Sequence, residues 1–358
     1  MKKPKLIYII GPNFCVKSLA LDSLKLLSKK YEVLCISEGP LIIDDHFQHI
    51  PIKFRREPSP LQDLFSLLQL IKLIFLNRDA KKIVISTPKI SLLSSLACII
   101  TMKRYVYLHR GAVYQNFKGI KFMLYKLIDK FIINFSSNTT FISESLYKFI
   151  NTELKIDDIS YMRKYNSSKG VDLKKFCIKE NKSDYSKINI GYCGRVANDK
   201  GFDDLRDLIN KYSNNSNIQI HIKGKIELDS REELILKELI EKEKVFFERW
   251  DEFVPEFFQK IDILFFPSKR EGFGNVAAEA AACGVPSVAY DIPGIRDAIK
   301  HNESGLLAKE KSNLTELIDI LINDVDKLRY LSTSSRYFAE KNFDKQLVLD
   351  DLHRCMEL

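Results

Sequence analysis

The sequence lacks any apolar run long enough to cross a membrane. Of its 358 residues 45% are apolar, yet no uninterrupted apolar stretch approaches the roughly 20 residues that span a bilayer. After the basic start MKKPK, the apolar run LIYII is shorter than a signal-peptide core and fits a buried first strand better. These features predict a cytoplasmic protein in which any membrane contact is peripheral.

Paired cysteines are also missing. The seven cysteines are an odd number, none stands in a CxxC pair, and several lie within apolar runs. This pattern predicts buried free thiols in a reducing compartment rather than a disulfide framework.

The loop after the first predicted strand has no GxGxxG motif. It reads GPNFCVKS, in which Gly11 is the single glycine, so dinucleotide binding is not supported. A nucleotide-sugar epimerase would need further glycines here, and Tyr161–Lys164 and Tyr105–His109 both miss the Tyr-x3-Lys pattern of such an enzyme, so the missing glycines argue against this class. No recognised DNA- or RNA-binding motif occurs either. We nevertheless expect Gly11 to open the floor of a cleft, on the acceptor side.

Charge is unevenly divided along the chain. Residues 1–180 contain 30 Lys+Arg and 15 Asp+Glu, a net charge of +15, whereas residues 181–358 contain 26 and 32, a net charge of −6. This asymmetry indicates that the first half faces an anionic partner, for which nucleic acid, an anionic membrane and an anionic substrate all qualify. A solvated basic surface is the plain alternative.

Short apolar strands alternate with amphipathic helices along the whole chain. The candidate strands are 5–11, 31–37, 81–87, 103–109 and 138–143, then 188–194, 218–224, 244–250, 262–267 and 286–291. Strands that are apolar throughout and separated by helices predict parallel sheets covered on both faces, an α/β fold. The alternation breaks over a polar stretch, so we expect two Rossmann-like domains, 1–170 and 187–342, joined by a linker over 171–186. Ligands would bind beyond the carboxyl ends of the strands.

The stretch PSKREGFGNVAAEAAACGVP, residues 267–286, predicts a phosphate-binding loop. An apolar strand ends at Pro267, two glycines follow, and a helix should begin near Asn275 and end before Gly284. Glycines before a helix N-terminus let backbone N–H groups approach an anion. Glu279 would suit a ribose hydroxyl and Glu271 another hydroxyl. A tight strand-to-helix turn with a capping glutamate remains an alternative.

Two other strand ends carry candidate residues. In INIGYCGRVANDKGFDDL, residues 188–205, Arg195 and Lys200 follow a strand and are suited to a diphosphate, although a solvated loop explains them equally. In YLHRGAVYQN, residues 107–116, His109, Arg110 and Gly111 would face the cleft from the first domain. A histidine at a strand end is more often structural.

The segments GRVANDKG (194–201) and EGFGNVAAE (271–279) together resemble retaining glycosyltransferases of family 4, the "glycosyl transferases group 1" type with the GT-B fold. GVDLKKF (170–176) and GVPSVAYDIPGIRDAI (284–299) resemble other parts of that family's second domain. The Glu-x7-Glu pair of Glu271 and Glu279 is the most specific element. The resemblance implies that 343–358 forms a helix returning to the first domain.

The same resemblance implies roles for the candidate residues. Arg195 and Lys200 would bind the diphosphate of a nucleotide sugar and assist its departure. Glu271 would contact the transferred sugar, Glu279 the ribose, and His109 would lie near the reacting sugar. The remaining donor-binding residues would be Gly272, Phe273, Gly274, Asn275 and Val276. Acceptor-side residues would be Gly11, Arg110 and Gly111.

The family works without a metal or other cofactor, and the only Asp-x-Asp of this sequence, Asp324 to Asp326, lies in a late helical segment rather than after a strand. Retention is expected through a front-face, oxocarbenium-like route that needs no pair of catalytic carboxylates. UDP is the expected nucleotide, and the transferred sugar is a hexose or an N-acetylhexosamine. The acceptor-side loop, with its single glycine, departs from the glycine-rich loop common in the family.

The helix expected over 118–133 raises the question of a membrane-bound acceptor. At 100° per residue, Ile120, Leu124, Leu127 and Phe131 form a predicted core face, whereas Phe122 and Tyr125 fall among four lysines on the other side. Aromatics among lysines are typical of an interfacial face, and also of a solvated helix. We therefore expect a glycan or lipid-linked acceptor of a bacterial surface polysaccharide (O-antigen, capsule or lipopolysaccharide), at the inner leaflet. The alternative is a basic nucleic-acid- or membrane-binding protein without transferase activity.

Overall fold

The chain folds into two α/β units in a computed structural model that describes residues 3–55, 59–156, 163–178, 185–241, 245–251 and 254–357. Unit 1 comprises residues up to Lys169 together with Val348–Leu358, and unit 2 is Gly170–Leu347. The sequence predicted that the first domain ends at residue 170 and the second at residue 342, whereas the first segment of unit 1 ends at Lys169 and unit 2 ends at Leu347. The expected linker, 171–186, falls within unit 2, where Val171 pairs with Asp344, and its residues 179–184 lie outside the described part.

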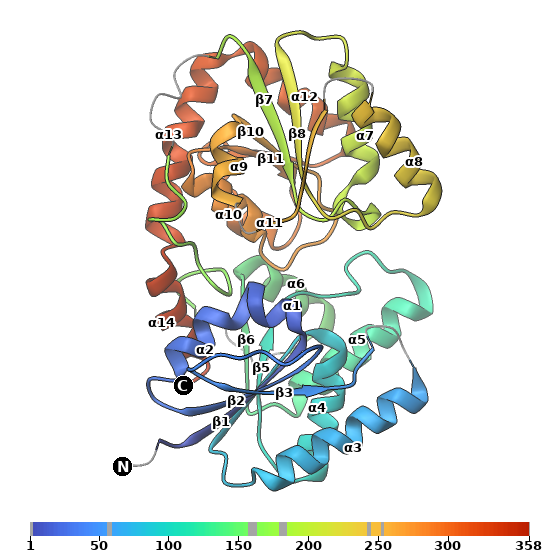
Figure 1. The fold of residues 1–358 in the computed structure, drawn as a ribbon, viewed down its shortest axis with the longest axis vertical. Coiled ribbons are helices and arrows are strands. Elements are labelled where there is room, and N and C mark those ends of the chain that lie inside the picture. Colours follow the sequence, from blue (N-terminus) through green and yellow to red (C-terminus); the bar gives the residue numbers. More distant parts are fainter. Residues whose placement is uncertain are drawn as a thin grey trace. The chain divides into compact units, whose positions relative to one another are not determined.

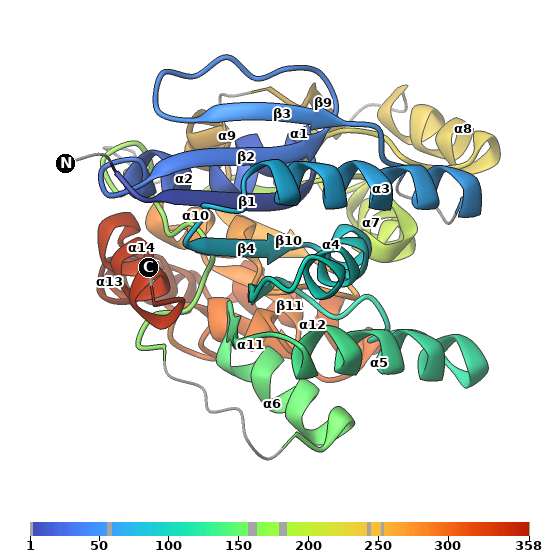
Figure 2. The same cartoon turned by 90° about the horizontal axis from the view of Figure 1, so that it is seen from below.

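Unit 1 contains a parallel sheet in the order β3-β2-β1-β4-β5-β6 (Figures 1 and 2). Its elements are β1 (Lys5–Pro12), α1 (Asn13–Cys15), the π-helical turn η1 (Val16–Ala20), α2 (Leu21–Leu27), β2 (Glu32–Glu38), β3 (Gln48–Ile52), α3 (Pro60–Leu76), β4 (Lys82–Ser86), α4 (Pro88–Ile100), β5 (Val106–His109), α5 (Gly119–Asn134), β6 (Asn138–Phe141) and α6 (Glu144–Leu154).

Unit 2 contains a second parallel sheet, in the order β12-β11-β10-β7-β8-β9. Its elements are β7 (Ile188–Cys193), the 3₁₀ turn η2 (Asn198–Lys200), α7 (Phe202–Tyr212), β8 (Ile218–Gly224), α8 (Ser230–Leu239), β9 (Val245–Arg249), α9 (Val254–Lys260), β10 (Ile263–Phe266), α10 (Asn275–Ala282), β11 (Ser287–Tyr290), α11 (Ile295–Ala298), β12 (Gly305–Ala308), α12 (Lys311–Asn323) and α13 (Val325–Asn342).

The two parallel sheets confirm the predicted α/β fold, and two edge strands were missed. β3 and β12 lie at one edge of their sheets. β3 contains Pro51, which cannot donate to a ladder and lowers the strand signal of its segment. β12, GLLA, contains no β-branched or aromatic residue, so its segment carries little strand signal.

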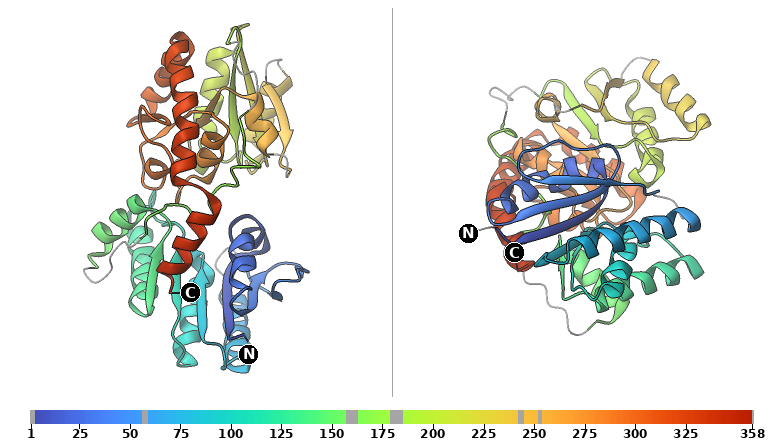
Figure 3. Two further views of the ribbon diagram at one scale, coloured as in Figure 1. Left: turned by 90° about the vertical axis from the view of Figure 1, so that its left-hand side faces the viewer. Right: turned by 60° about the horizontal axis from the view of Figure 1, so that its bottom comes forward.

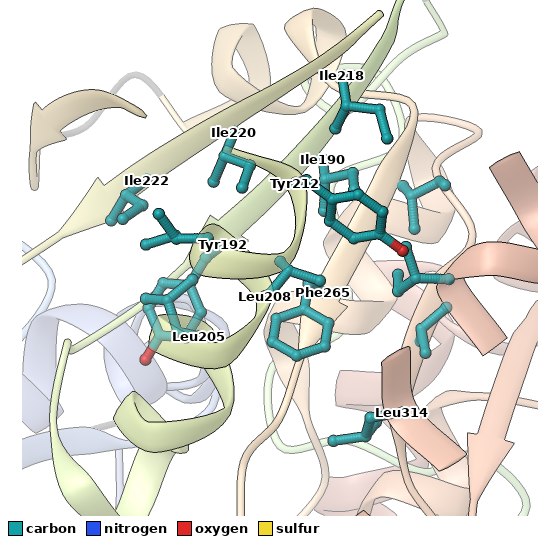
Figure 4. Packing of buried hydrophobic residues seen from close by; sticks show 14 of the residues in the cluster. Ile190, Tyr192, Leu205, Leu208, Tyr212, Ile218, Ile220, Ile222, Phe265 and Leu314 are labelled. Carbon is teal, nitrogen blue, oxygen red and sulfur yellow. The ribbon is translucent and has the colours of Figure 1, made fainter. Parts of the chain in front are cut away.

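The core of unit 2 follows from the apolar strands of the sequence. Ile190, Ile220 and Phe265, from three strands, meet Leu205 and Leu208 of α7 in one buried cluster (Figure 4). Helix α7 has a strongly one-sided pattern, with its apolar residues on the face toward the sheet and its charged residues, apart from the buried Asp204, outward. This packing fixes the strand ends from which the candidate site is built.

The last helix was expected over 343–358. Helix α14 (Lys345–Cys355) begins in unit 2, and from Val348 onward the chain belongs to unit 1 (Figure 3). The amide of Asn138 on β6 donates to the carbonyl of Cys355 at 2.7 Å. The Arg163 side chain is 1% exposed and donates from Nε to Asp351 Oδ2 at 3.2 Å. His353 is buried, and its Nε2 lies 2.7 Å from Ser23 Oγ of α2.

Helix α5 is turned differently from the sequence expectation. Ile120, Leu124 and Leu127 were predicted to face the core and are 86%, 54% and 62% exposed. Phe122 and Tyr125, predicted to face outward, are half-buried, with rings against Tyr114 and Phe117. The core-face prediction was wrong because apolar residues surround this helix, and the buried side is selected by Asp129, whose hydrogen bonds to unit 1 the sequence does not reveal.

Burial of His353 predicts a pH-dependent stability of unit 1. Burial lowers the pKa of His353 to about 4, from about 6.5 in the unfolded chain. Between these values the unfolded state binds the proton and the folded state does not. Stability is therefore complete above pH 6.5 and falls as the pH drops toward 4, by about 2 kcal/mol at pH 5.

Urea unfolding followed by circular dichroism at pH 7.5 and 5.0 measures this loss. His353→Gln is expected to reduce the difference by the contribution of His353, about 2 kcal/mol, whereas His301→Gln, which replaces an exposed histidine, should retain it. An unchanged pH dependence in His353→Gln would contradict the assignment.

Candidate functional site

The strand order of unit 2 reverses between β7 and β10. β7 pairs with β8 on one side and β10 on the other, and both pairs are parallel. The connections leaving these two strands therefore diverge to opposite sides, which creates a crevice at the carboxyl ends of β7 and β10. The loop after β7 carries Arg195 and Lys200, and the loop after β10 carries Glu271.

Lys200 and Glu271 meet at this crevice. Lys200 Nζ lies 2.5 Å from Glu271 Oε1, and the two side chains are 20% and 19% exposed. The same Nζ donates to Ser268 Oγ and to the Arg270 carbonyl, each at 3.2 Å. Ser268 Oγ in turn donates to Glu271 Oε1 at 3.0 Å. A charge-assisted network of this kind holds both loops in one arrangement.

Arg195 is held by two acids that the sequence analysis did not single out. Nη1 donates to Glu227 at 2.8 Å, and Nη2 donates to Asp199 Oδ2 at 3.1 Å. Arg270 also reaches Asp199, at 3.4 Å. Burial alone would raise the pKa of Asp199, but the charges of Arg195, Lys200 and Arg270 outweigh it and lower the pKa. The two acids therefore fix the guanidinium at the crevice, and Asp199 is shared between Arg195 and Arg270.

Hydrogen bonds from a buried tyrosine and a close contact at a glycine hold the loop after β7 in place. The hydroxyl of Tyr192, which is buried, donates to the carbonyl of Arg195 at 2.5 Å and of Lys200 at 3.3 Å. Gly201 has φ +82°, and a Cβ there would meet the Pro267 carbonyl oxygen at 2.3 Å. Only glycine allows the two loops to approach this closely.

The stretch from Gly272 to Val276 enters α10 as predicted. Gly274 occupies the N-cap, and the helix runs from Asn275 to Ala282. The Phe273 side chain is buried with its ring 5.3 Å from that of Phe343, so only its backbone is available to a ligand. The N-terminus of α10 places the positive end of a helix dipole at the crevice.

Glu279 lies on α10 and is 6% exposed. Burial raises the pKa of the Cys193 thiol, and the next largest contribution is the negative charge of Glu279. Since Cys193 is the last residue of β7, this interaction places the Glu279 carboxylate near the same strand end as Arg195 and Lys200. The sequence-predicted site residues of unit 2 thus follow β7 and β10 or lie on α10, and contacts join Lys200 directly to Glu271.

In unit 1 the corresponding reversal lies between β1 and β4. The Gly11 amide, on β1, donates to Thr87 Oγ1 at 2.8 Å, directly after β4. Thr87 has φ +76°, which is rare for a β-branched residue. No motif or spacing in the sequence pointed to Thr87 as a candidate site residue. Strain of this kind gathers at ligand sites, and here it lies beside Gly11.

His109 is fully buried, unlike the cleft-facing position expected for it. Its Nε2 lies 2.8 Å from Asp129 Oδ2, and Asp129 also accepts hydrogen bonds from Tyr107 and Tyr114 at 3.2 and 3.1 Å. Nδ1 has no hydrogen-bond partner among the described residues. Asp129, on α5, thereby orients the histidine at the end of β5, and no sequence spacing could have linked the two.

Arg110 follows His109 and extends across the sheet edge. Its Nε donates to Ser86 Oγ at 2.8 Å, and one Nη donates to Tyr8 Oη at 3.1 Å. Ser86 ends β4, and Tyr8 lies on β1, so Arg110 reaches the strand reversal beside Gly11. Gly111 continues the loop with φ +149°. Gly11 and Arg110 thus share one edge of unit 1, and the predicted acceptor-side set belongs to this unit.

The comparisons with known proteins agree with this architecture. Residues 174–338 match the family model "Glycosyl transferases group 1". The chain is 29% identical over 328 residues to the "Capsular polysaccharide biosynthesis glycosyltransferase CapM" of Staphylococcus aureus, covering 86% of this chain and 84% of the relative.

Solved structures show the same fold at low identity. The HepE protein of Anabaena, crystallised with UDP and glucose, gives a TM-score of 0.76 at 17% identity over 98% of this chain and 99% of its own. Sucrose-phosphate synthase from Thermosynechococcus elongatus gives 0.81 at 16% identity, over 99% and 98%.

The fold and the family model together define the class of protein. The chain has the two-sheet GT-B architecture of glycosyltransferases. Over residues 174–338, which lie within unit 2, it is similar to the glycosyl transferases group 1 family.

The close approach at Gly201 predicts a large effect of one methyl group. Gly201→Ala combines an unfavourable positive φ with overlap against Pro267, and we expect a loss of roughly 2–4 kcal/mol in unfolding free energy. Gly119 has φ +62° and nothing within 4 Å of an added Cβ, so Gly119→Ala should cost about 1 kcal/mol. Urea unfolding followed by circular dichroism compares the two. Equal losses would show that contact between the loops is unimportant.

Proposed function

We propose that this chain transfers a hexose or N-acetylhexosamine from a UDP-sugar to a glycan or lipid-linked acceptor of a bacterial surface polysaccharide, with retention of anomeric configuration. The observation that carries the proposal is the Lys200–Glu271 pair at the reversal of the unit 2 sheet, next to the start of α10. The likeness to the capsular glycosyltransferase CapM over most of both chains supports the polysaccharide acceptor. Cytoplasmic location and an acceptor at the inner leaflet belong to the same proposal.

The donor diphosphate is assigned to the cations after β7. Lys200 is half-buried and already positioned by three hydrogen bonds, so binding an anion requires little ordering of its side chain. Arg195 presents a planar guanidinium suited to phosphate oxygens, and its two acids hold it beside the crevice. As the bond to the sugar breaks, these charges stabilise the negative charge that develops on the departing diphosphate.

The carboxylates are assigned to hydroxyl groups. Glu279, buried on α10, would accept hydrogen bonds from the ribose, and Glu271 from the transferred sugar. The backbone N–H groups at the start of α10, from Gly272 to Val276, would contact sugar and phosphate. His109, whose side chain is buried, would act near the reacting sugar or acceptor through its backbone, with Asp129 fixing its orientation. The acceptor-side contacts would come from Gly11, Arg110 and Gly111.

No metal or other cofactor enters this mechanism. The cations already at the crevice supply the charge stabilisation that a divalent ion would otherwise give to a diphosphate. A second carboxylate placed as a nucleophile is likewise unnecessary, because the departing phosphate can accept the proton of the incoming hydroxyl on the same face of the sugar.

Donor binding tests the assignment of residues. UDP should raise the melting temperature of the wild type, and Lys200→Ala and Glu279→Ala should each weaken binding by about tenfold to a hundredfold, the loss expected for one hydrogen bond to a charged group. Isothermal titration with UDP measures the affinities.

The matched controls are Lys341→Ala and Glu238→Ala, two exposed residues of unit 2 on helices α13 and α8. They should bind UDP as the wild type does. Unweakened binding in Lys200→Ala would contradict the diphosphate assignment. Binding of DNA, with no response to any nucleotide sugar, would support the nucleic-acid alternative.

Retention and metal independence have their own readout. Proton NMR of the product of an α-linked donor should show a newly formed α-linkage, and turnover should persist in excess EDTA. A β-linked product would contradict retention. Loss of activity in EDTA, restored by magnesium, would contradict metal independence and leave the donor assignment intact.

A further inference from the structure

Helix α3 exposes a continuous apolar stripe. The exposed fractions of six of its apolar side chains lie between 49% and 85%. They are Leu61, Leu64, Phe65, Leu68, Phe75 and Leu76. At 100° per residue these positions fall within about 120° of one another, and the buried Ser66, Leu70 and Ile74 lie on the opposite side. The helix is thus apolar on both sides, and one side has no partner within the described chain.

Helix α5 exposes a second apolar stripe. Ile120, Met123, Leu124 and Leu127 are 54–86% exposed and span about 100° around the helix axis. This is the face that the hydrophobic pattern alone assigns to the core. The side of α5 that packs against the rest of unit 1 instead carries the buried residues Asp129, Ile132 and Ile133.

The two stripes belong to one layer of unit 1. Helix α4 packs against α3 on one side and α5 on the other, and Figure 2 shows α3 and α5 flanking α4 and extending past it. At the end of α4, Ile100 and Met102 are 57% and 92% exposed and add to the apolar surface. Exposed apolar surface spread over several elements is typical of an interaction site.

The exposed, unpaired charges of this layer are positive. The acidic residues of α3 and α5 are Asp63 and Asp129; Asp63 pairs with Lys89 at 2.7 Å, and Asp129 is 7% exposed. By contrast, exposed cations accompany the stripes. They are Lys72, Arg104, Lys118, Lys121 and Lys130, and none of them forms an ion pair with another described residue. Lys72 lies within the α3 stripe itself.

We propose that the outer face of α3 and α5, with Ile100 and Met102, is a docking surface for an anionic phospholipid bilayer. Leucine and phenylalanine side chains would enter the region between headgroups and acyl chains, while the unpaired lysines contact lipid phosphates. A second copy of the chain fits less well, because a two-fold interface would bring the unneutralised cations of both copies together. Nucleic acid would bind through its phosphates and has no surface that would bury the apolar stripes.

This surface is separate from the donor residues, which all lie in unit 2. The proposal does not rest on the transferase activity. Its failure would leave the donor assignment standing, and failure of UDP binding would leave the docking surface standing.

Vesicle flotation of the full chain tests the proposal. The protein is expected to float with phosphatidylcholine vesicles that contain phosphatidylglycerol and to stay behind with phosphatidylcholine alone, and the binding should weaken with added salt. The double variant Phe65→Ser/Leu68→Ser should bind about tenfold more weakly or worse. The double variant Lys72→Glu/Lys130→Glu should lose about thirtyfold or more.

Matched controls come from exposed residues of unit 2. Leu234 and Tyr337 are 60% and 63% exposed, so Leu234→Ser/Tyr337→Ser removes comparable apolar surface. Lys309→Glu/Lys341→Glu makes the same change of charge on exposed lysines. Both controls should float as the wild type does. Melting curves and UDP titration confirm that every variant is folded.

Three results would overturn the proposal. The wild type remains unbound to anionic vesicles; the α3 and α5 variants float as well as the unit 2 controls; or the wild type forms a dimer that Phe65→Ser/Leu68→Ser dissociates, which would assign the surface to a second copy of the chain.

Discussion

The candidate site depends on one topological constraint, the reversal of strand order between β7 and β10. Parallel strands deliver the residues that follow them to the same edge of a sheet, and the reversal separates the two helices that would otherwise cover that edge. Lys200 and Glu271 are 71 positions apart in sequence, yet their side-chain atoms lie 2.5 Å apart because each follows a strand at the reversal. The positive φ of Gly201 and the hydroxyl of Tyr192 then hold the loops in place.

The sheet of unit 1 also reverses its strand order, and different residue types lie at that reversal. Gly11 and Arg110 lie at the reversal between β1 and β4, beside the strained Thr87. The outer helices of the same unit carry exposed apolar residues and unpaired lysines. Unit 1 therefore presents hydrogen-bonded polar groups at the strand ends of its sheet and an apolar, basic surface on its outer helices.

Much of the fold could be predicted from the sequence, since strands buried on both faces are apolar runs with clear boundaries. The edge strands β3 and β12 could not, because one contains Pro51 and the other, GLLA, has no β-branched or aromatic residue. The rotation of α5 was misread because its apolar residues surround the axis, and the decisive contacts of Asp129 with His109, Tyr107 and Tyr114 join residues whose spacing carries no signal. The site residues of unit 2 were found through glycines and charges after strands, whereas Asp199 and Glu227 resemble ordinary surface acids until Arg195 is seen between them.

The central claim is that the crevice between the β7 and β10 loops holds the diphosphate of a nucleotide sugar. A crystal structure of the protein with bound UDP tests it most directly. The account predicts phosphate oxygens within hydrogen-bonding distance of Lys200 Nζ and the Arg195 guanidinium, with the ribose hydroxyls at Glu279. A diphosphate bound away from these residues, with the Lys200–Glu271 pair undisturbed, would contradict it.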